Sequence, residues 1–111
     1  MSKPRLRRIS VVVPTRDRPD CLRQALASIR ALEAPDIKFE ILVGDNGNDP
    51  RTLAIANEFD AVHIPVSRNG AGAARNAGLR VASGDYIAFL DDDDVWLDSH
   101  IRPHLALLDA N

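Results

Sequence analysis

A chain of 111 residues with 45% apolar and 27% charged residues is expected to form one soluble globular domain. Its net charge of −2 argues against a nucleic-acid-binding protein, which would have a basic face, so no nucleic-acid partner is predicted. Cys21 is the only cysteine, which excludes an internal disulfide bond and favours a reducing compartment, here the cytoplasm.

The chain begins with a basic segment, and residues 1–8 are predicted to be a flexible leader. Its lysine and arginine side chains could contact an anionic membrane surface peripherally. The apolar run at residues 9–13 stops at Pro14 and is too short for a signal-peptide core or a membrane span. We therefore expect no transmembrane segment.

Short apolar runs alternate with helical patterns along the rest of the chain. Strands are predicted at residues 9–13, 39–43, 61–64 and 86–90. Helices are predicted from Pro19 to about residue 32 and over about residues 51–59, 73–82 and 99–110. This alternation is typical of an α/β fold with three layers, in which helices cover both faces of a mainly parallel sheet.

Unusual polar residues follow three of the four predicted strands. Thr15, Arg16 and Asp17 follow the first strand, Asp45 follows the second, and residues 91–94 follow the fourth. Sheets of this kind bind ligands outside the carboxyl ends of their strands. A strand order of 3-2-1-4 would gather these residues at one edge. We therefore predict this Rossmann-like order and a binding site at that edge.

The four consecutive carboxylates at residues 91–94 have no basic residue among them. Like charges so close together repel one another unless a cation is shared among them. Oxygen ligands of this kind suit hard divalent ions such as Mg²⁺, Mn²⁺ or Ca²⁺. A solvated acidic turn is the other interpretation, but residues 86–90 before the run read as a buried strand. The pattern therefore favours a metal site.

Two familiar motifs do not fit the chain. A dinucleotide-binding loop is disfavoured because Arg75 stands where the glycine motif needs its third glycine, and because the loop follows the third strand. A calcium loop beginning at Asp91 is also excluded. Its positions for an oxygen ligand, a glycine and a glutamate are occupied by Val95, Trp96 and Arg102.

A nucleoside diphosphate held through a divalent ion agrees better with these residues. The ion would neutralise a leaving diphosphate. Asp45 could accept a hydrogen bond from a base or a ribose hydroxyl, and Arg68 or Arg75 could pair with phosphate oxygens. A surface ion pair is the other interpretation of each arginine. The thiol of Cys21 is interpreted as inert. The histidines are interpreted as packed or solvated: His63, His100 and His104.

Four ordered motifs carry a family resemblance. They are SVVVPTRDR at residues 10–18, ILVGDNG at 41–47, NGAGAARNAG at 69–78 and ASGDYIAFLDDDD at 82–94. Together they resemble the glycosyltransferase family 2 enzymes of the GT-A fold, and the resemblance extends from about residue 9 to the end. In that family this region binds the nucleotide-sugar donor, so the resemblance implies a donor-binding domain at residues 9–111.

The resemblance also implies roles for single residues around the nucleotide. Pro14, Thr15 and Arg16 would line the base pocket. Asp45 would contact the base, and Arg75 would lie near the base or the diphosphate.

The acidic run matches the family's DXD motif, with a register left open by one residue because four acids are consecutive. The resemblance implies that Asp91 and Asp92 contact the nucleotide, with Asp91 toward the ribose. It further implies that Asp93, together with Asp91, binds Mn²⁺ or Mg²⁺ on the diphosphate.

The resemblance implies an inverting glycosyltransferase whose donor is expected to be a UDP-sugar, with an acceptor that is not specified. The family's acceptor half, which carries the catalytic base, is expected to be absent from this chain. The alternative is a nucleotide-sugar-binding module without turnover, or a truncated inactive product. We therefore expect a folded chain that is inactive alone and self-associates through an exposed sheet edge or through the apolar face of the last helix.

Overall fold

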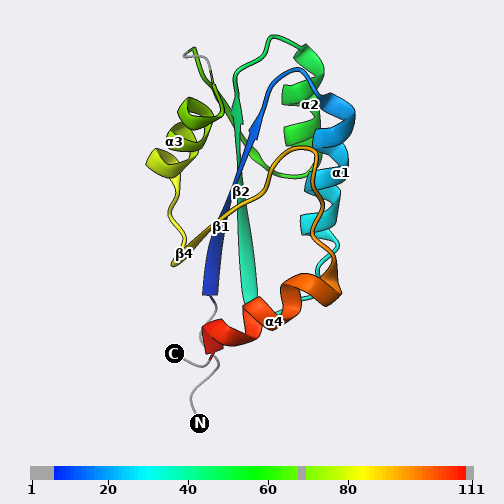
Figure 1. The fold of residues 1–111 in the computed structure, drawn as a ribbon, viewed down its shortest axis with the longest axis vertical. Coiled ribbons are helices and arrows are strands. Elements are labelled where there is room, and N and C mark those ends of the chain that lie inside the picture. Colours follow the sequence, from blue (N-terminus) through cyan, green and yellow to red (C-terminus); the bar gives the residue numbers. More distant parts are fainter. Residues whose placement is uncertain (1–6, 68–69, 110–111) are drawn as a thin grey trace.

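The computed structural model describes residues 7–67 and 70–109, which form alternating strands and helices (Figure 1). The strands are β1 (Arg7–Thr15), β2 (Ile37–Asp45), β3 (Val62–Pro65) and β4 (Tyr86–Phe89). The helices are α1 (Pro19–Arg30), α2 (Pro50–Glu58), α3 (Ala71–Val81) and α4 (Asp98–Asp109). All pairings between the strands are parallel, in the order β3-β2-β1-β4. The predicted α/β fold and strand order are therefore confirmed.

Strand β1 pairs with β2 over its whole length, from Arg7 opposite Ile37 to Thr15 opposite Asp45. It therefore begins two residues earlier than predicted, and its start is held where the Arg7 N–H donates to the Asp36 carbonyl at 2.9 Å. Arg7 and Arg8 thus belong to the sheet and not to a leader. The rest of the predicted leader, residues 1–6, lies outside the described residues.

Helices α1 and α2 lie on one side of the sheet and α3 lies on the other (Figure 1). The core between the sheet and α1 uses every second residue of the two central strands, as the pleat requires. Its main side chains are those of Ile9, Val11, Val13, Leu22, Leu26, Ile29, Phe39, Ile41 and Val43. None of the helices in the described part of the chain is apolar over a stretch long enough to span a membrane.

Helix α3 lies directly on the sheet because small residues face it. A Cβ atom at Gly44, near the end of β2, would lie 2.4 Å from the carbonyl oxygen of Ala74 in α3. Ala74 itself is fully buried. The small residues thus permit a close approach of α3 to the sheet, which brings the start of α3 next to the carboxyl ends of β1 and β2.

Strand β4 is not buried, so the expectation of a buried strand before the acidic run is wrong. Tyr86, Ile87 and Phe89 are 36%, 46% and 48% exposed. Among the described strands β4 pairs only with β1, and α3 packs over β1 and β2 instead. An apolar composition predicted burial on both faces, but the position at the sheet edge leaves these side chains open. Leu90, which follows the strand, is buried.

A polar network at the amino end of the sheet positions the turn before β4. The Ser10 hydroxyl, which is fully buried, donates to Glu40 Oε1 at 2.7 Å and accepts from the Gly84 N–H at 2.8 Å. Ser83 donates to the same carboxylate from its N–H and its hydroxyl. Burial alone would raise the pKa of Glu40, but these hydrogen bonds and the charge of Arg8 lower it below its usual value.

Candidate functional site

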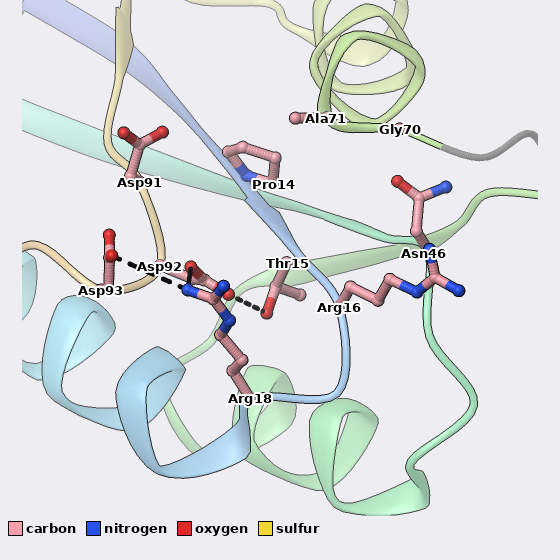
Figure 2. A pocket seen from close by; sticks show the side chains of 10 residues that line it. All are labelled: Pro14, Thr15, Arg16, Arg18, Asn46, Gly70, Ala71, Asp91, Asp92 and Asp93. Atoms are coloured by element: carbon pink, nitrogen blue, oxygen red, sulfur yellow. Dashed lines mark hydrogen bonds and ion pairs between the residues drawn. The ribbon is translucent and has the colours of Figure 1, made fainter.

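A pocket of about 440 Å³ lies at the carboxyl ends of β1, β2 and β4 (Figure 2). This is the edge at which the topology of a parallel sheet predicts a ligand site. The residues that line it are Pro14, Thr15, Arg16, Arg18, Asn46, Gly70, Ala71, Asp91, Asp92 and Asp93.

Six of the predicted site residues line this pocket: Pro14, Thr15, Arg16, Asp91, Asp92 and Asp93. Two others, Asp45 and Arg75, are not among the lining residues. Arg75 Nη2 lies 3.4 Å from Asp91 Oδ1, so its guanidinium is an ion-pair partner of the acidic run. Arg68, the alternative phosphate partner, lies outside the described residues.

The acidic run divides into one buried and three exposed carboxylates. Asp92 is 8% exposed, and its Oδ2 accepts a hydrogen bond from the Thr15 hydroxyl at 2.8 Å. The run folds back as a turn in which the Asp94 N–H donates to the Asp91 carbonyl at 3.0 Å. The turn therefore anchors Asp92 to β1 and leaves the other three side chains toward solvent.

The exposed carboxylates fit a hard divalent ion. One oxygen from each of Asp91, Asp93 and Asp94 lies within 4.8 Å of the other two. Carboxylate oxygens at this spacing are ligands that Mg²⁺ and Mn²⁺ accept, with water completing the coordination. Both predicted metal ligands, Asp91 and Asp93, belong to this group. Asp94 is an additional candidate that the two-residue assignment left out.

Arg18 is a site residue that the sequence analysis missed. It precedes α1, and its Nη1 lies 3.5 Å from Asp92 Oδ1 and 3.7 Å from Asp93 Oδ2 (Figure 2). Its side chain is 56% exposed. Its place in the turn after β1, three residues beyond Thr15, was the available signal, since that turn lies at the predicted ligand edge.

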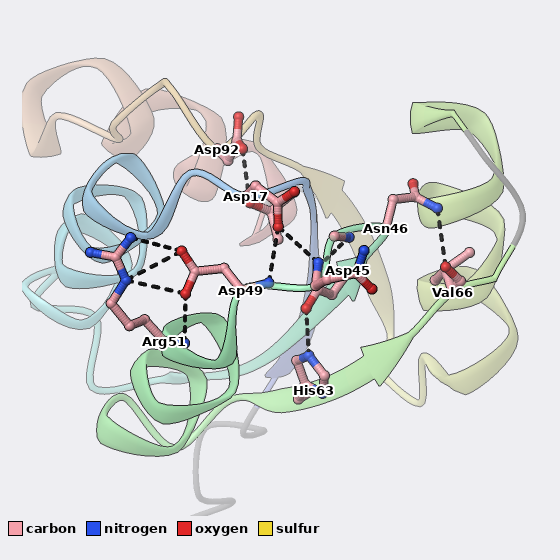
Figure 3. Close-up of polar contacts among 11 residues, drawn as sticks. Asp17, Asp45, Asn46, Asp49, Arg51, His63, Val66 and Asp92 are labelled. Carbon is pink, nitrogen blue, oxygen red and sulfur yellow. Dashed lines mark hydrogen bonds and ion pairs between the residues drawn. The ribbon is translucent and has the colours of Figure 1, made fainter.

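Asp17 joins the two loops that form one wall of the pocket. Its Oδ1 accepts hydrogen bonds from the N–H groups of Asn48 and Asp49 at 2.8 and 3.0 Å (Figure 3). Its backbone has a φ of 51°, a left-handed conformation that aspartate tolerates better than most residues. Asp49 in turn caps α2 by accepting from the Arg51 N–H. The loops after β1 and β2 are therefore tied together.

Asp45 is held inside its own loop. It is 6% exposed, its Oδ1 accepts from the Gly47 N–H at 2.7 Å, and its Oδ2 lies 2.8 Å from Nε2 of His63 (Figure 3). His63 is thus a packed histidine, as interpreted, but its contact with Asp45 was missed. The next residue, Asn46, lines the pocket and donates to the Val66 carbonyl at 3.4 Å.

The start of α3 forms the opposite wall of the pocket. Gly70 precedes the helix with a φ of 109°, a conformation open to glycine and strained for other residues. Among the described residues, no side chain caps this helix start. The first N–H groups of a helix have no partner within the helix, so they favour an anion or a carbonyl oxygen nearby.

The chain is similar in sequence to proteins that transfer sugars. The profile described as Glycosyl transferase family 2 matches residues 10–111. The UDP-Glc:alpha-D-GlcNAc-diphosphoundecaprenol beta-1,3-glucosyltransferase WfgD of Escherichia coli is 29% identical over 107 residues. That match covers 93% of this chain and 42% of WfgD.

Its fold is similar to that of GT-A glycosyltransferases. S. aureus TarS 1-349 in complex with UDP matches with a TM-score of 0.81 and 27% identity, over 93% of this chain and 32% of that one. Glucosyl-3-phosphoglycerate synthase from Mycobacterium tuberculosis, in complex with Mn²⁺, UDP and glucosyl-3-phosphoglycerate, matches with a TM-score of 0.65 and 28% identity. That match covers 78% of this chain and 33% of the synthase. The chain therefore spans less than half the length of each of these relatives.

Proposed function

We propose that this chain, which belongs to glycosyltransferase family 2, binds the nucleoside diphosphate of a sugar donor in the pocket at the carboxyl ends of β1, β2 and β4. The observation that carries the proposal is the position of the exposed carboxylates of Asp91 and Asp93 on the same pocket as Pro14 and Arg16. An acidic site accepts a negatively charged diphosphate only when a cation lies between them. The name of WfgD includes UDP-Glc, and the similar structure of TarS is a complex with UDP, so a UDP-sugar is the proposed donor.

A divalent ion, Mn²⁺ or Mg²⁺, would be held by Asp91 and Asp93, with Asp94 as a further ligand. When bound, such an ion neutralises the charge that develops on a leaving diphosphate. Asp92 contributes differently, because its hydrogen bond with Thr15 fixes the acidic loop against β1. The proposed division of the motif is therefore one anchor and two or three metal ligands. The M. tuberculosis synthase, whose structure contains Mn²⁺ and UDP, supports this choice of ion.

The base would lie against Pro14, Thr15 and Arg16 at the end of β1. Asn46 offers an amide that can donate and accept at the edge of the base. The predicted contribution of Asp45 becomes indirect in this proposal, because its oxygens already bind Gly47 and His63 and so hold the loop that presents Asn46.

The diphosphate would lie between the metal and the uncapped start of α3. Arg75 is 41% exposed and pairs with Asp91 over 3.4 Å, a long contact that a phosphate oxygen could replace. A guanidinium group suits this exchange because it binds phosphate with two parallel donors.

Inverting transfer also needs a base that deprotonates the acceptor hydroxyl. In the described part of the chain, the acids at the strand ends are already assigned to the donor, the metal or the loops. We therefore propose that this chain alone binds the donor without repeated transfer, and that acceptor and base come from elsewhere. A nucleotide-sugar-binding module without turnover is the alternative function. Neither function includes repeated transfer by this chain alone, so multiple turnovers from a UDP-sugar to added acceptors would contradict both.

Calorimetry with UDP tests the donor site directly. We expect UDP to bind weakly in the presence of a chelator and at least tenfold more tightly with saturating Mn²⁺, because the ion bridges two negative partners. The affinities for GDP and ADP under the same conditions show which nucleotide base the pocket prefers. Equal UDP affinity with and without the chelator would remove the metal from the proposal. No binding of any nucleotide would overturn the donor site itself.

The exposed edge of β4 is proposed to pair with a second copy of this chain. The Leu90 N–H donates to the Val12 carbonyl at 3.1 Å, so the pleat directs the N–H groups of Ile87 and Phe89 to the opposite edge. Their side chains are also about half exposed. Edges of this kind tend to associate with another strand. Light scattering should show a mass that rises with concentration and falls in Ile87→Lys, whereas a monomer at high concentration would contradict self-association.

A further inference from the structure

The acidic run is contacted by two guanidinium groups before any metal is considered. Arg75 pairs with Asp91 at one end of the run, and Arg18 pairs with Asp92 and Asp93 near its middle (Figure 2). These arginines come from different elements, α3 and the turn before α1. The protein thus supplies its own positive charge to a site that is suited to a divalent cation.

Asp93 belongs to both arrangements. It is one of the three carboxylates whose oxygens lie within 4.8 Å of one another, and its Oδ2 lies 3.7 Å from Nη1 of Arg18. A divalent ion on Asp93 would therefore lie close to the guanidinium group, and like charges repel. The ion and Arg18 cannot both keep their full interaction with this carboxylate.

Asp92 gives Arg18 a second attachment. Its carboxylate is buried, with one oxygen bound to Thr15 and the other facing Arg18 at 3.5 Å. Arg18 itself is more than half exposed and lines the same pocket. Its long side chain can therefore leave Asp93 and turn into the pocket without uncovering the core.

We propose that Arg18 couples metal binding to diphosphate binding by exchanging partners. In the free protein its guanidinium group occupies Asp93 and weakens the binding of Mn²⁺. When a nucleoside diphosphate enters, the guanidinium group moves to a phosphate oxygen and Asp93 becomes available to the ion. Metal and nucleotide then bind more tightly together than either does alone. This inference rests on the proposed donor site and assigns to Arg18 the task of linking its two ligands.

The exchange predicts opposite effects of one substitution on two affinities. In Arg18→Gln, the free protein should bind Mn²⁺ about two- to fivefold more tightly, the range expected for removal of one competing exposed ion pair. The same variant should bind UDP in saturating Mn²⁺ about tenfold more weakly, because a charged donor to phosphate is lost. The coupling between Mn²⁺ and UDP should decrease by the same factor whichever ligand is titrated first.

The measurements are Mn²⁺ titration of the free protein by electron paramagnetic resonance and UDP calorimetry with and without Mn²⁺. Arg18→Lys keeps the charge and loses the planar fork, so its Mn²⁺ affinity should remain that of the wild type while its UDP affinity falls. Arg23→Gln is the matched control. Arg23 lies on α1, is similarly exposed and pairs with Glu58 away from the pocket, so both affinities should stay unchanged.

The outcomes separate this inference from the donor site on which it rests. A wild type that binds UDP with Mn²⁺, combined with an Arg18→Gln variant whose Mn²⁺ affinity is unchanged or weaker, would overturn the exchange and leave the donor site intact. A wild type that binds neither ligand would overturn both. Lower Mn²⁺ and UDP affinities in both Arg18 variants would indicate a purely structural contribution of Arg18 and would also reject the exchange.

Discussion

Polar side chains gather at both ends of the sheet, and hydrogen bonds enclose one carboxylate, that of Glu40, at the amino end. There, both oxygens of Glu40 accept hydrogen bonds from Ser10 and Ser83 at 2.7–3.0 Å. At the carboxyl end, Asp91, Asp93 and Asp94 stand exposed with their oxygens close together. The first arrangement is complete without a ligand, whereas the second concentrates negative charge that a cation would relieve.

This difference separates a structural carboxylate from a binding carboxylate. Glu40 is connected to β1 and to the turn before β4, so its loss should weaken the fold. Asp93 is exposed and pairs with the exposed side chain of Arg18, so its loss should spare the fold and remove a ligand. Both carboxylates have polar neighbours. They differ in hydrogen bonding, because both oxygens of Glu40 accept hydrogen bonds from serine residues, whereas Asp93 lies beside an arginine and two other acids.

The largest expected effect is on ligand binding at the carboxyl end. In Asp93→Asn, the Mn²⁺-dependent UDP affinity should fall by about a hundredfold, the upper range for damage to a metal's ligand environment. The free energy of unfolding should stay the same or rise slightly, because one of several like charges is removed. Calorimetry and urea denaturation measure the two quantities. A large loss of stability with little change in affinity would place Asp93 with the structural carboxylates.

Next in size is the loss of stability at the amino end. Glu40→Ala leaves the buried Ser10 hydroxyl without its acceptor, and the free energy of unfolding should decrease by about 2 kcal/mol. The UDP affinity should stay unchanged, because the network lies at the opposite end of the strands. Urea denaturation and UDP calorimetry on the same sample check both statements. Lys38→Ala is the control. Lys38 lies on the same strand, directly before Phe39, and its side chain is exposed, so both values should stay unchanged.

A smaller effect on both stability and UDP affinity is expected at Thr15, where a structural hydrogen bond lies within the binding site. Thr15 donates to the buried carboxylate of Asp92 in the middle of the acidic run, so this pair resembles the amino-end network. Thr15→Val should lower the free energy of unfolding by about 1 kcal/mol, and it should weaken UDP binding severalfold because the acidic loop loses its anchor. Thr15→Ser keeps the hydroxyl and should restore both. Equal behaviour of the two variants would show that the hydroxyl is unimportant.

Much of the fold follows from local patterns. The alternation of apolar runs and helical stripes predicted the parallel sheet, because each run is short and each crossover contains a helix. The strand order was predicted differently, from the need to gather the polar residues that follow three strands at one edge, and it is the order observed. The burial of β4 was mispredicted for a physical reason. Its composition resembles that of β1, but its exposure depends on its edge position and on the coverage by α3, which are properties of the assembled sheet.

The pocket could be predicted for residues at or near the carboxyl end of a strand, such as Thr15 and Asp91. Arg18 and Asp17 lie in the turn beyond β1, where the direction of a side chain depends on backbone angles such as the φ of 51° at Asp17. The contact between His63 and Asp45 joins residues 18 positions apart on neighbouring strands. Such contacts depend on the strand register, because a shift of one residue turns every side chain to the other face, and the sequence analysis assigned no register.

The smallest expected effect is a pH dependence that belongs to the amino end alone. The pKa of Glu40 lies below its usual value of 4.5 because hydrogen bonds from Ser83 and Ser10 outweigh the effect of burial. A carboxyl group whose pKa is depressed by folding contributes stability above its unfolded pKa and loses that contribution as the pH falls through its folded pKa. The stability advantage of the wild type over Glu40→Gln should therefore be constant near pH 7 and shrink below about pH 4.5. Since the carboxyl group of Glu40 is partly solvated, the change in stability should be modest.

Urea denaturation of both proteins between pH 7 and pH 3 measures this change, with UDP absent so that the acidic run does not contribute through ligand binding. An advantage that grew as the pH fell would mean that protonated Glu40 is the better partner of Ser10. The amino-end network would then owe its stability to neutral hydrogen bonds, and charge would no longer distinguish the two ends of the sheet.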